Sequence, residues 1–166
     1  MTGCRVIPGH RLPSPALSPF LVLPLHSETG FSWFDSLILT EKERKPDQPR
    51  LLSVDNEIVV PVNKVVRVQV TGAEVIHAFA VPSFGVKIDA IPGRLNETWF
   101  KVTKEGTYYG QCSELCGKDH SFMPIVVRVV KDSDFTAWVE DAKKKYAGVE
   151  SVPPNTFAAA AAQLPR

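Results

Sequence analysis

The chain has 166 residues, and its 19 basic and 18 acidic side chains give a formal net charge of +1. With 22% charged residues and no basic excess, the sequence predicts no nucleic-acid partner. The length suits one domain of ordinary size with tails, and a hydrophobic fraction of 44% is ample for a core. The 14 prolines and 10 glycines indicate many turns, as in a β-rich body.

Residues 1–49 do not resemble the rest of the chain. Five prolines fall within 1–26, and the apolar run at 20–25 is far shorter than the roughly 20 residues that cross a bilayer. The same prolines, and the lack of a clean small-x-small cleavage site, argue against a signal peptide. A charged, proline-marked connector follows at 41–49. We therefore expect residues 1–49 to form an atypical, largely irregular leader and connector.

From residue 50 the apolar residues recur with a period of two. Three valines alternate with polar residues over 66–70, as in a half-buried strand. Short strands are expected at 51–54, 57–60, 66–70, 76–81, 86–91, 95–102, 107–111 and 125–130. Many short strands separated by Gly and Pro are typical of a β-sandwich, so we predict an all-β domain over 50–131.

A helix is expected after the last strand, over 132–147. Its apolar face would comprise Phe135, Trp138, Val139, Ala142 and Tyr146. Three consecutive lysines near its end suit the negative pole of the helix dipole. We predict that this short amphipathic helix packs on the sandwich, with Trp138 as a packing residue. Residues 148–166, with two adjacent prolines and a run of alanines, are expected to form a flexible tail.

The loop expected before the last strand carries four soft metal ligands. Cys112 and Cys116 are followed by His120 and Met123, and thiolate, imidazole and thioether together favour copper. At a single metal one thiolate would be spare, whereas thiolates that bridge two metals leave none spare. A second metal needs a second imidazole, and His77 is the candidate because the other two histidines lie in the leader. The motif favours a dinuclear copper site.

Each of these residues also has an ordinary interpretation. A Cys-x3-Cys pair alone is more often a reduced core pair, a disulfide or part of a zinc site. Cys112, Cys116, His120 and His77 could together bind one structural zinc ion. Met123 argues against zinc, which has little use for a thioether, although an isolated Met also fills gaps in cores. From the residues alone, copper is favoured and zinc stays open.

The stretches 54–56, 77–83, 89–96 and 108–117 closely resemble the copper-binding domain of the cytochrome c oxidase subunit II family. The resemblance covers 50–130, roughly half of the chain. It implies a Greek-key cupredoxin β-sandwich with a short C-terminal α-helix and a dinuclear copper centre called CuA. The family ordinarily begins with two membrane-spanning helices, which this sequence does not show. By this comparison the chain resembles a truncated or split subunit.

The resemblance also assigns a role to each residue of the centre. It implies six ligands to the copper pair, namely bridging Cys112 and Cys116, terminal His77 and His120, and weakly bound Met123 and Glu114. Glu114 would bind through its backbone carbonyl. Its side chain is implied to help hold a magnesium ion at the interface with subunit I.

Function and partners are implied in the same way. The chain would take electrons from cytochrome c and pass them through CuA to haem a of subunit I, where oxygen is reduced. It would act only as a subunit of this oxidoreductase, with no catalytic residues of its own, and copper metallochaperones would load the centre. The domain would face the periplasm at a bacterial membrane, or the intermembrane space in a mitochondrion. Asp55 and Glu74 are candidate docking residues for cytochrome c.

The sequence is also compatible with two other functions. A free-standing soluble copper-binding or carrier module could use the same ligands, and it would exchange copper rapidly with a chelator. A non-functional truncated subunit II would fail to fold or to find its oxidase. The unusual leader is the feature that keeps the second interpretation open.

Overall fold

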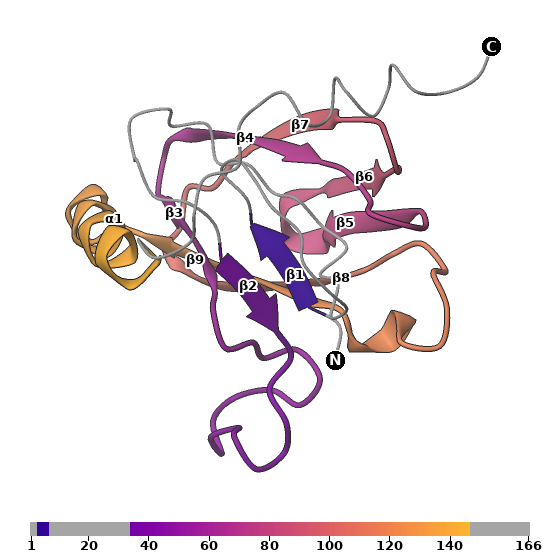
Figure 1. Ribbon diagram of the computed structural model, residues 1–166. Helices are drawn as coiled ribbons and strands as arrows, with labels where there is room; N and C mark the ends of the chain where they lie inside the picture. Colours follow the sequence, from indigo (N-terminus) through magenta and orange to yellow (C-terminus); the bar gives the residue numbers. More distant parts are fainter. Residues whose placement is uncertain (1–2, 7–33, 147–166) are drawn as a thin grey trace.

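The computed structural model describes residues 3–6 and 34–146 (Figure 1). Its elements are β1 (Gly3–Val6), β2 (Phe34–Leu37), β3 (Ile58–Pro61), β4 (Val65–Val70), β5 (His77–Val81), η1 (Pro82–Phe84), β6 (Val86–Ala90), β7 (Asn96–Lys101), β8 (Gly106–Gln111), η2 (His120–Phe122), β9 (Pro124–Val130) and α1 (Asp132–Tyr146). The predicted tail and the apolar run at 20–25 lie outside the described residues. No helix within the described residues is long and apolar enough to cross a membrane.

The strands form one three-stranded sheet and three two-stranded ribbons. In the larger sheet β9 is central, with β3 parallel to it on one side and β8 antiparallel on the other. β4 pairs with β7 and β5 pairs with β6, both antiparallel. Figure 1 shows these two ribbons stacked over the β3–β9–β8 sheet, with α1 at one end. The prediction of a mostly β domain with one C-terminal helix is confirmed.

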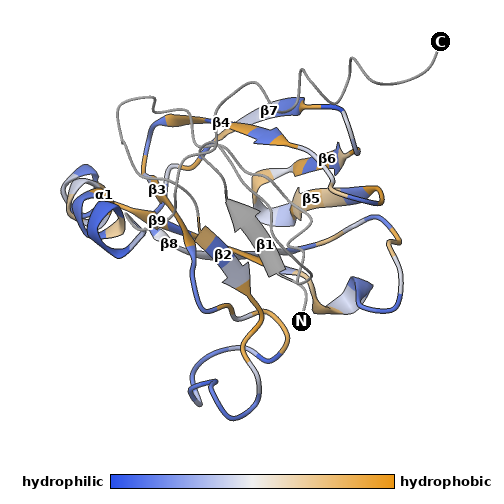
Figure 2. Cartoon of the chain, in the orientation of Figure 1, coloured by the Kyte–Doolittle hydropathy of each residue, from blue (hydrophilic) through white to orange (hydrophobic). Residues whose placement is uncertain are grey.

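The core between these layers is rich in valine. All of β5 and most of β9 are buried, and both strands consist mainly of apolar residues. β4 buries alternate residues, Val68 and Val70, as its alternating sequence predicted. Figure 2 shows orange hydrophobic segments on strands such as β3 and β5, and blue hydrophilic segments on the outer part of the loop at the bottom and on much of α1. A close-packed interior of this kind holds the strand ends in fixed positions.

Gly110 in β8 allows two strands to approach closely. A Cβ atom at this position would collide with the carbonyl oxygen of Ala80 in β5. The absence of a side chain therefore lets β8 and β5 pack backbone against backbone. His77 begins β5 and Cys112 follows the end of β8, so this contact determines how near the two side chains lie.

The helix α1 packs through the aromatic face that its sequence predicted. Phe34 stacks on Tyr146 with ring centroids 5.0 Å apart and meets Trp138 edge-on at 6.3 Å. The Tyr146 hydroxyl donates to Asn56 Oδ1 over 2.9 Å. Aromatic pairs in these geometries stabilise a fold beyond their area burial. α1 thus joins the end of the domain to β2 near its start.

Two features near the start of the domain differ from the predictions. The strand predicted at 51–54 is wrong, because Leu51 adopts a left-handed backbone with φ of 64° and only Val54 pairs, in an isolated bridge with Ile38. β1 and β2, which pair antiparallel, were not predicted within the leader. Each is only four residues long, and pairing comes from a distant segment that local periodicity does not reveal.

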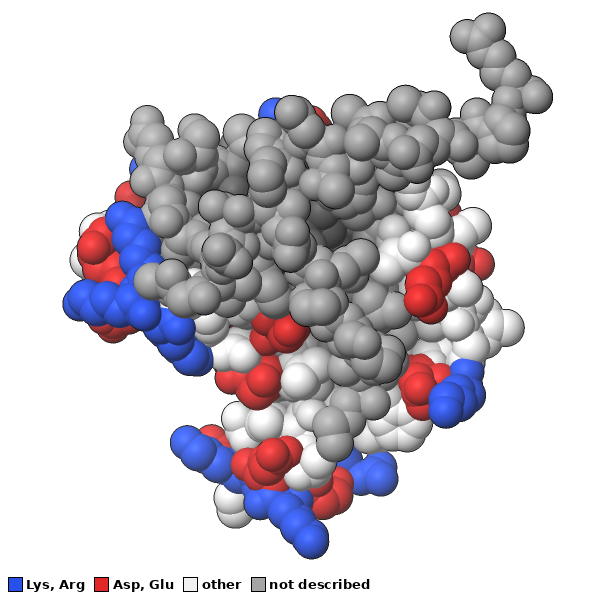
Figure 3. Space-filling model, in the orientation of Figure 1, with Lys and Arg blue, Asp and Glu red and all other residues white. Residues whose placement is uncertain are grey.

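Residues 38–56 include the charged stretch predicted at 41–49 and are called the connector from here on; they are held largely by local hydrogen bonds and ion pairs. Glu41 accepts from Arg44 Nη2 over 3.0 Å and from Arg50 Nε over 2.8 Å. Ser53 Oγ donates to the carbonyl of Pro49 over 2.8 Å. At the bottom of Figure 3 the acidic and basic side chains of this segment lie together. The connector is irregular in backbone but closed by local contacts.

Candidate metal centre

The site lies where β5 begins and where β8 gives way to the ligand loop, residues 112–123, before β9. His77 comes from the start of β5, and the loop supplies the other predicted donors. The loop is closed at its base by a hydrogen bond from Cys112 N to the Met123 carbonyl over 3.0 Å. Two stacked layers of the domain therefore contribute to one site.

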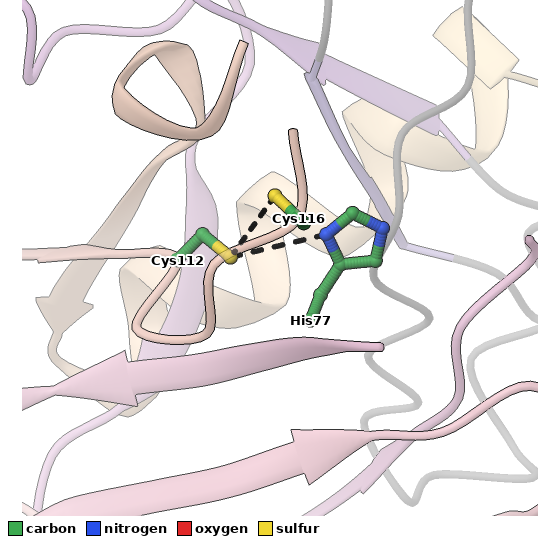
Figure 4. Close-up of side chains that lie close together, drawn as sticks. All are labelled: His77, Cys112 and Cys116. Atoms are coloured by element: carbon green, nitrogen blue, oxygen red, sulfur yellow. Dashed lines mark hydrogen bonds between the residues drawn. The ribbon is translucent and has the colours of Figure 1, made fainter. Parts of the chain in front are cut away.

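Three donor atoms form the first part of the site (Figure 4). Cys112 Sγ lies 3.8 Å from His77 Nδ1 and 3.8 Å from Cys116 Sγ. The donor atoms of these three residues all lie within 4.8 Å of one another, close enough to hold a metal ion. Both cysteines are free thiols, since a disulfide would bring the sulfurs to about 2.05 Å.

Three further donors lie on the other sides of the two sulfurs. Cys116 Sγ is 3.4 Å from His120 Nδ1 and 3.5 Å from Met123 Sδ. The Cys112 thiol donates to the backbone carbonyl of Glu114 over 3.3 Å. Each sulfur thus has its own imidazole and its own weaker donor, and the two sulfurs are neighbours.

These separations fit donors that share metal ions. Two ligands bound at about 2.0–2.3 Å in tetrahedral directions lie about 3.4–3.8 Å apart. The observed sulfur–sulfur and sulfur–nitrogen separations of 3.4–3.8 Å fall in this range. A set of two thiols, two imidazoles and a thioether is soft and suits copper. The residues present therefore fit a copper pair.

Burial governs the protonation of the donors. His77 is 8% exposed, and this burial, together with the nearby His120, lowers the pKa of its imidazole. A neutral imidazole offers the lone pair that a metal needs. Burial and the adjacent Cys112 sulfur raise the pKa of the Cys116 thiol to about 11. A thiolate at neutral pH therefore requires a nearby cation, and metal binding would release protons.

The backbone of the loop is fixed against β5 and turned by a glycine. Ser113 N donates to the carbonyl of Ala78, next to His77, over 3.2 Å. Gly117 has φ of 129°, a conformation that side chains rarely adopt, and it precedes the short helix η2 that carries His120. These features bring the C-terminal half of the loop back towards Cys112.

The remaining predicted residues lie apart from the donor cluster. The Glu114 carboxylate points to Lys87, with Oε2 3.7 Å from Nζ. Asp55 Oδ1 accepts backbone hydrogen bonds from Leu37 over 2.6 Å and Asn56 over 2.7 Å, so its carboxylate holds the connector. Glu74 is exposed in the turn before β5. Sequence reasoning missed Lys87, and no spacing in the sequence links it to the loop.

Comparison with known proteins identifies the same segment. A family model described as cytochrome c oxidase subunit II, periplasmic domain, matches residues 26–130. The probable cytochrome c oxidase subunit 2 of Rickettsia bellii is 57% identical over 130 residues, which are 78% of this chain and 47% of that protein. Cytochrome c oxidase subunit 2 of Cyanidium caldarium is 54% identical over 117 residues, 70% of this chain and 46% of that protein. The chain thus spans under half the length of these two relatives.

Two solved structures are similar in both sequence and fold. The periplasmic domain of subunit II of cytochrome oxidase (CoxB) of Bradyrhizobium japonicum is 69% identical, with a TM-score of 0.67, covering 73% of this chain and 84% of that chain. A mixed disulfide intermediate between a thioredoxin-like protein, TlpA, and subunit II of cytochrome c oxidase contains a chain 71% identical, with a TM-score of 0.59 over 70% of this chain and 78% of that one. The similarity to the first supports the predicted cupredoxin fold.

Proposed function

Because the chain belongs to the cytochrome c oxidase subunit II family, matched over its periplasmic domain, we propose that it holds the dinuclear copper centre CuA and relays electrons. The electrons would come from cytochrome c and pass to haem a of subunit I. The single observation that supports this most strongly is that two thiols 3.8 Å apart each meet an imidazole and a weaker donor. That arrangement suits two metals that share two sulfurs.

The proposal assigns each donor to the copper pair. Cys112 and Cys116 would bridge the coppers, His77 and His120 would bind one each, and Met123 Sδ and the Glu114 carbonyl would be weak ligands. A bound copper pair would supply one-electron redox chemistry at this edge of the sandwich. The chain itself would hold the donors in place. Met123, which is 2% exposed, and the buried Cys112 are fixed because they are part of the packed core. Donors that barely move when an electron arrives keep the reorganisation cost small.

A thioether favours copper over zinc at this site. Met123 Sδ lies 3.5 Å from Cys116 Sγ, within the donor cluster. Structural zinc sites use Cys, His or carboxylate ligands and have little use for a thioether. A copper carrier would need donors that release the metal readily, whereas the donors here come from two layers of a packed domain. An electron-transfer site therefore fits the architecture better than storage does.

The partners and location of the chain are part of the proposal. We propose docking to subunit I, with the Glu114 carboxylate helping to bind a magnesium ion at that interface. Glu74, exposed near His77, is the better candidate for meeting a basic cytochrome c, since the Asp55 carboxylate already accepts backbone hydrogen bonds from Leu37 and Asn56. The domain would face the periplasm, or the intermembrane space in a mitochondrion, and oxygen reduction would belong to the assembled oxidase.

Copper loading requires both cysteines in the thiol form. The two sulfurs are near enough that modest movement would allow a disulfide, which could not bridge metals. In the similar complex, a thioredoxin-like protein forms a mixed disulfide with subunit II. We propose that a partner of this kind reduces Cys112 and Cys116 before copper metallochaperones deliver the metal.

The test is an EPR spectrum, with metal analysis, of the chain after loading with copper. The proposal predicts two coppers per chain and a hyperfine pattern from one electron shared equally by both nuclei. An isolated Cu(II) spectrum, or one bound zinc ion in its place, would contradict CuA. Rapid loss of copper to a chelator would favour a carrier. A chain that takes up no metal would correspond to a non-functional subunit.

A further inference from the structure

Lys87 of β6 reaches across to the ligand loop. Its Nζ lies 3.1 Å from Asp89 Oδ1 and 3.7 Å from Glu114 Oε2. Residues two apart in a strand share a face, so Asp89 holds the ammonium from the same side of β6. Glu114 is the residue whose carbonyl faces the Cys112 sulfur. One lysine therefore links β6 to a residue that also contacts the donor cluster.

The backbone attaches the loop to the same ribbon at the preceding residue. Ser113 N donates to Ala78 O over 3.2 Å, and Ala78 is the β5 partner of Asp89 in β6. The β5–β6 ribbon thus carries His77, receives the Ser113 amide and provides Lys87. A residue held at its side chain and at the preceding amide has little freedom to rotate its carbonyl. For Glu114 that carbonyl lies 3.3 Å from Cys112 Sγ.

We propose that Lys87 is a positioning residue for the metal centre, an inference that rests on the proposed function. By holding the Glu114 carboxylate, Lys87 orients the Glu114 carbonyl towards the Cys112 sulfur. The same contact keeps the ligand loop against the ribbon that carries His77. Lys87 acts through Glu114, and Asp89 acts through Lys87.

Because Lys87 and Glu114 are exposed, the effect of Lys87 on the loop can be measured apart from any effect on the stability of the fold. The side chains of Lys87 and Glu114 are 52% and 44% exposed. The distance from Lys87 Nζ to Glu114, 3.7 Å, is longer than its distance to Asp89, 3.1 Å. Exposed ion pairs contribute little to the free energy of unfolding. Loss of Lys87 should therefore leave the unfolding midpoint unchanged and alter only the loop. A variant that folds normally makes the effect on the site measurable.

The experiment compares Lys87→Met with a matched charge control, Lys118→Met, and with Lys87→Arg. Lys118 is exposed in the ligand loop and forms no ion pair with any residue that the structure describes. Its substitution removes one positive charge near the centre without releasing Glu114. Lys87→Arg keeps a donor for both carboxylates and should restore wild-type behaviour.

The first measurement uses the metal-free chain. We expect amide hydrogen exchange at Ser113 to be about threefold faster in Lys87→Met and unchanged in Lys87→Arg and Lys118→Met, because only the first loosens the loop. Exchange at the wild-type rate in Lys87→Met would overturn the inference. This result does not depend on copper, so it decides the role of Lys87 even if the loaded wild-type chain shows no dinuclear spectrum and the proposed function fails.

The second measurement uses the copper-loaded chains. Both Met variants lose one positive charge, which lowers the reduction potential, but only Lys87→Met also loosens an oxygen donor that stabilises Cu(II). We therefore expect the potential of Lys87→Met to lie above that of Lys118→Met. Equal potentials in the two variants would mean that Lys87 acts only as a nearby charge, and would overturn a positioning role.

Discussion

The connector and the ligand loop are both irregular segments between strands, yet they are held in different ways. In the connector, charged side chains contact other parts of the same segment, as when Arg44 Nη1 donates to the Gln48 carbonyl over 2.6 Å. In the ligand loop, backbone bonds at Cys112 and Ser113 fix one end, and the side chains face one another as soft donors. The connector pairs most of its charged side chains with one another, although the buried Arg44 Nε has no hydrogen-bond partner among the described residues. The ligand loop instead brings together donor atoms that a metal would complete.

Stability and chemistry are separated between these two segments of the domain. The ion pairs of Glu41 with Arg44 and Arg50 in the connector are local and mostly exposed, so their loss should cost little stability and leave the site untouched. Contacts in the loop join β5, β6 and β8, so a change there should alter the site strongly even where the fold survives. Substitutions in the two regions can test this separation.

The largest effect is expected from removing one thiol of the ligand loop. Cys116→Ser, like Cys112→Ser, replaces a bridging sulfur by a hard hydroxyl, so the dinuclear EPR pattern should disappear and fewer than two coppers should bind per chain. The free energy of unfolding of the metal-free chain should change by only about 1 kcal/mol. Ser113→Ala, at an exposed position of the same loop, is the control and should keep both coppers. A dinuclear spectrum in either serine variant would refute the bridging assignment.

The next effect concerns the reactivity of Cys116. With its pKa raised to about 11 from an ordinary 9.0, the folded chain at pH 8 should react with iodoacetamide about 100-fold more slowly at this residue than the urea-unfolded chain. Between pH 9 and 11 the unfolded chain loses this proton first, so the free energy of unfolding should fall as pH rises. Mass spectrometry of the metal-free chain measures the rates, and equal rates in both states would contradict a raised pKa.

A smaller effect is expected from Met123→Leu. Leucine has a similar volume, so the buried position should cost under about 1.5 kcal/mol of unfolding free energy. Two coppers should remain bound, because both thiols and both imidazoles are intact, and the reduction potential should shift with the loss of the thioether. Redox titration of the loaded chain measures this shift. An unchanged potential would show that Met123 only packs against the cluster.

Much of this architecture follows from the sequence because its signals are local. Alternating valines predicted β4, and β5 and β9 were predicted as short apolar strands between loops, since burial leaves a direct trace in the residue pattern. The soft donors of the ligand loop were recognisable by type, and the structure brings them together with His77. Their roles at a metal remain proposals. Residue chemistry and spacing were enough to nominate the site.

Other features depend on contacts that sequence spacing does not record. Leu51 enters a left-handed turn in a stretch whose composition suggested a strand, because the connector must turn before β3. Asp55, a candidate docking residue, accepts backbone hydrogen bonds from Leu37 and Asn56, contacts that the sequence pattern does not reveal. Lys87 meets Glu114 only because β6 pairs with β5 in one register. Such relations arise from tertiary packing, which no local pattern specifies.

The smallest effect is expected from Glu41→Gln in the connector. The two arginines beside it, Arg44 first, hold the pKa of Glu41 below its usual 4.5, so the carboxylate favours the folded state above that pH and loses this contribution as pH falls through its folded pKa. At pH 7 and low salt the variant should lower Tm by no more than about 2 °C, and the difference should vanish in acid or high salt. The copper spectrum should match the wild type, because no contact of Glu41 reaches the ligand loop. Thermal unfolding followed by circular dichroism measures Tm, and EPR on the same samples measures the copper spectrum. A changed spectrum would mean that the connector and the ligand loop are coupled, so that stability and chemistry are not separated in this domain.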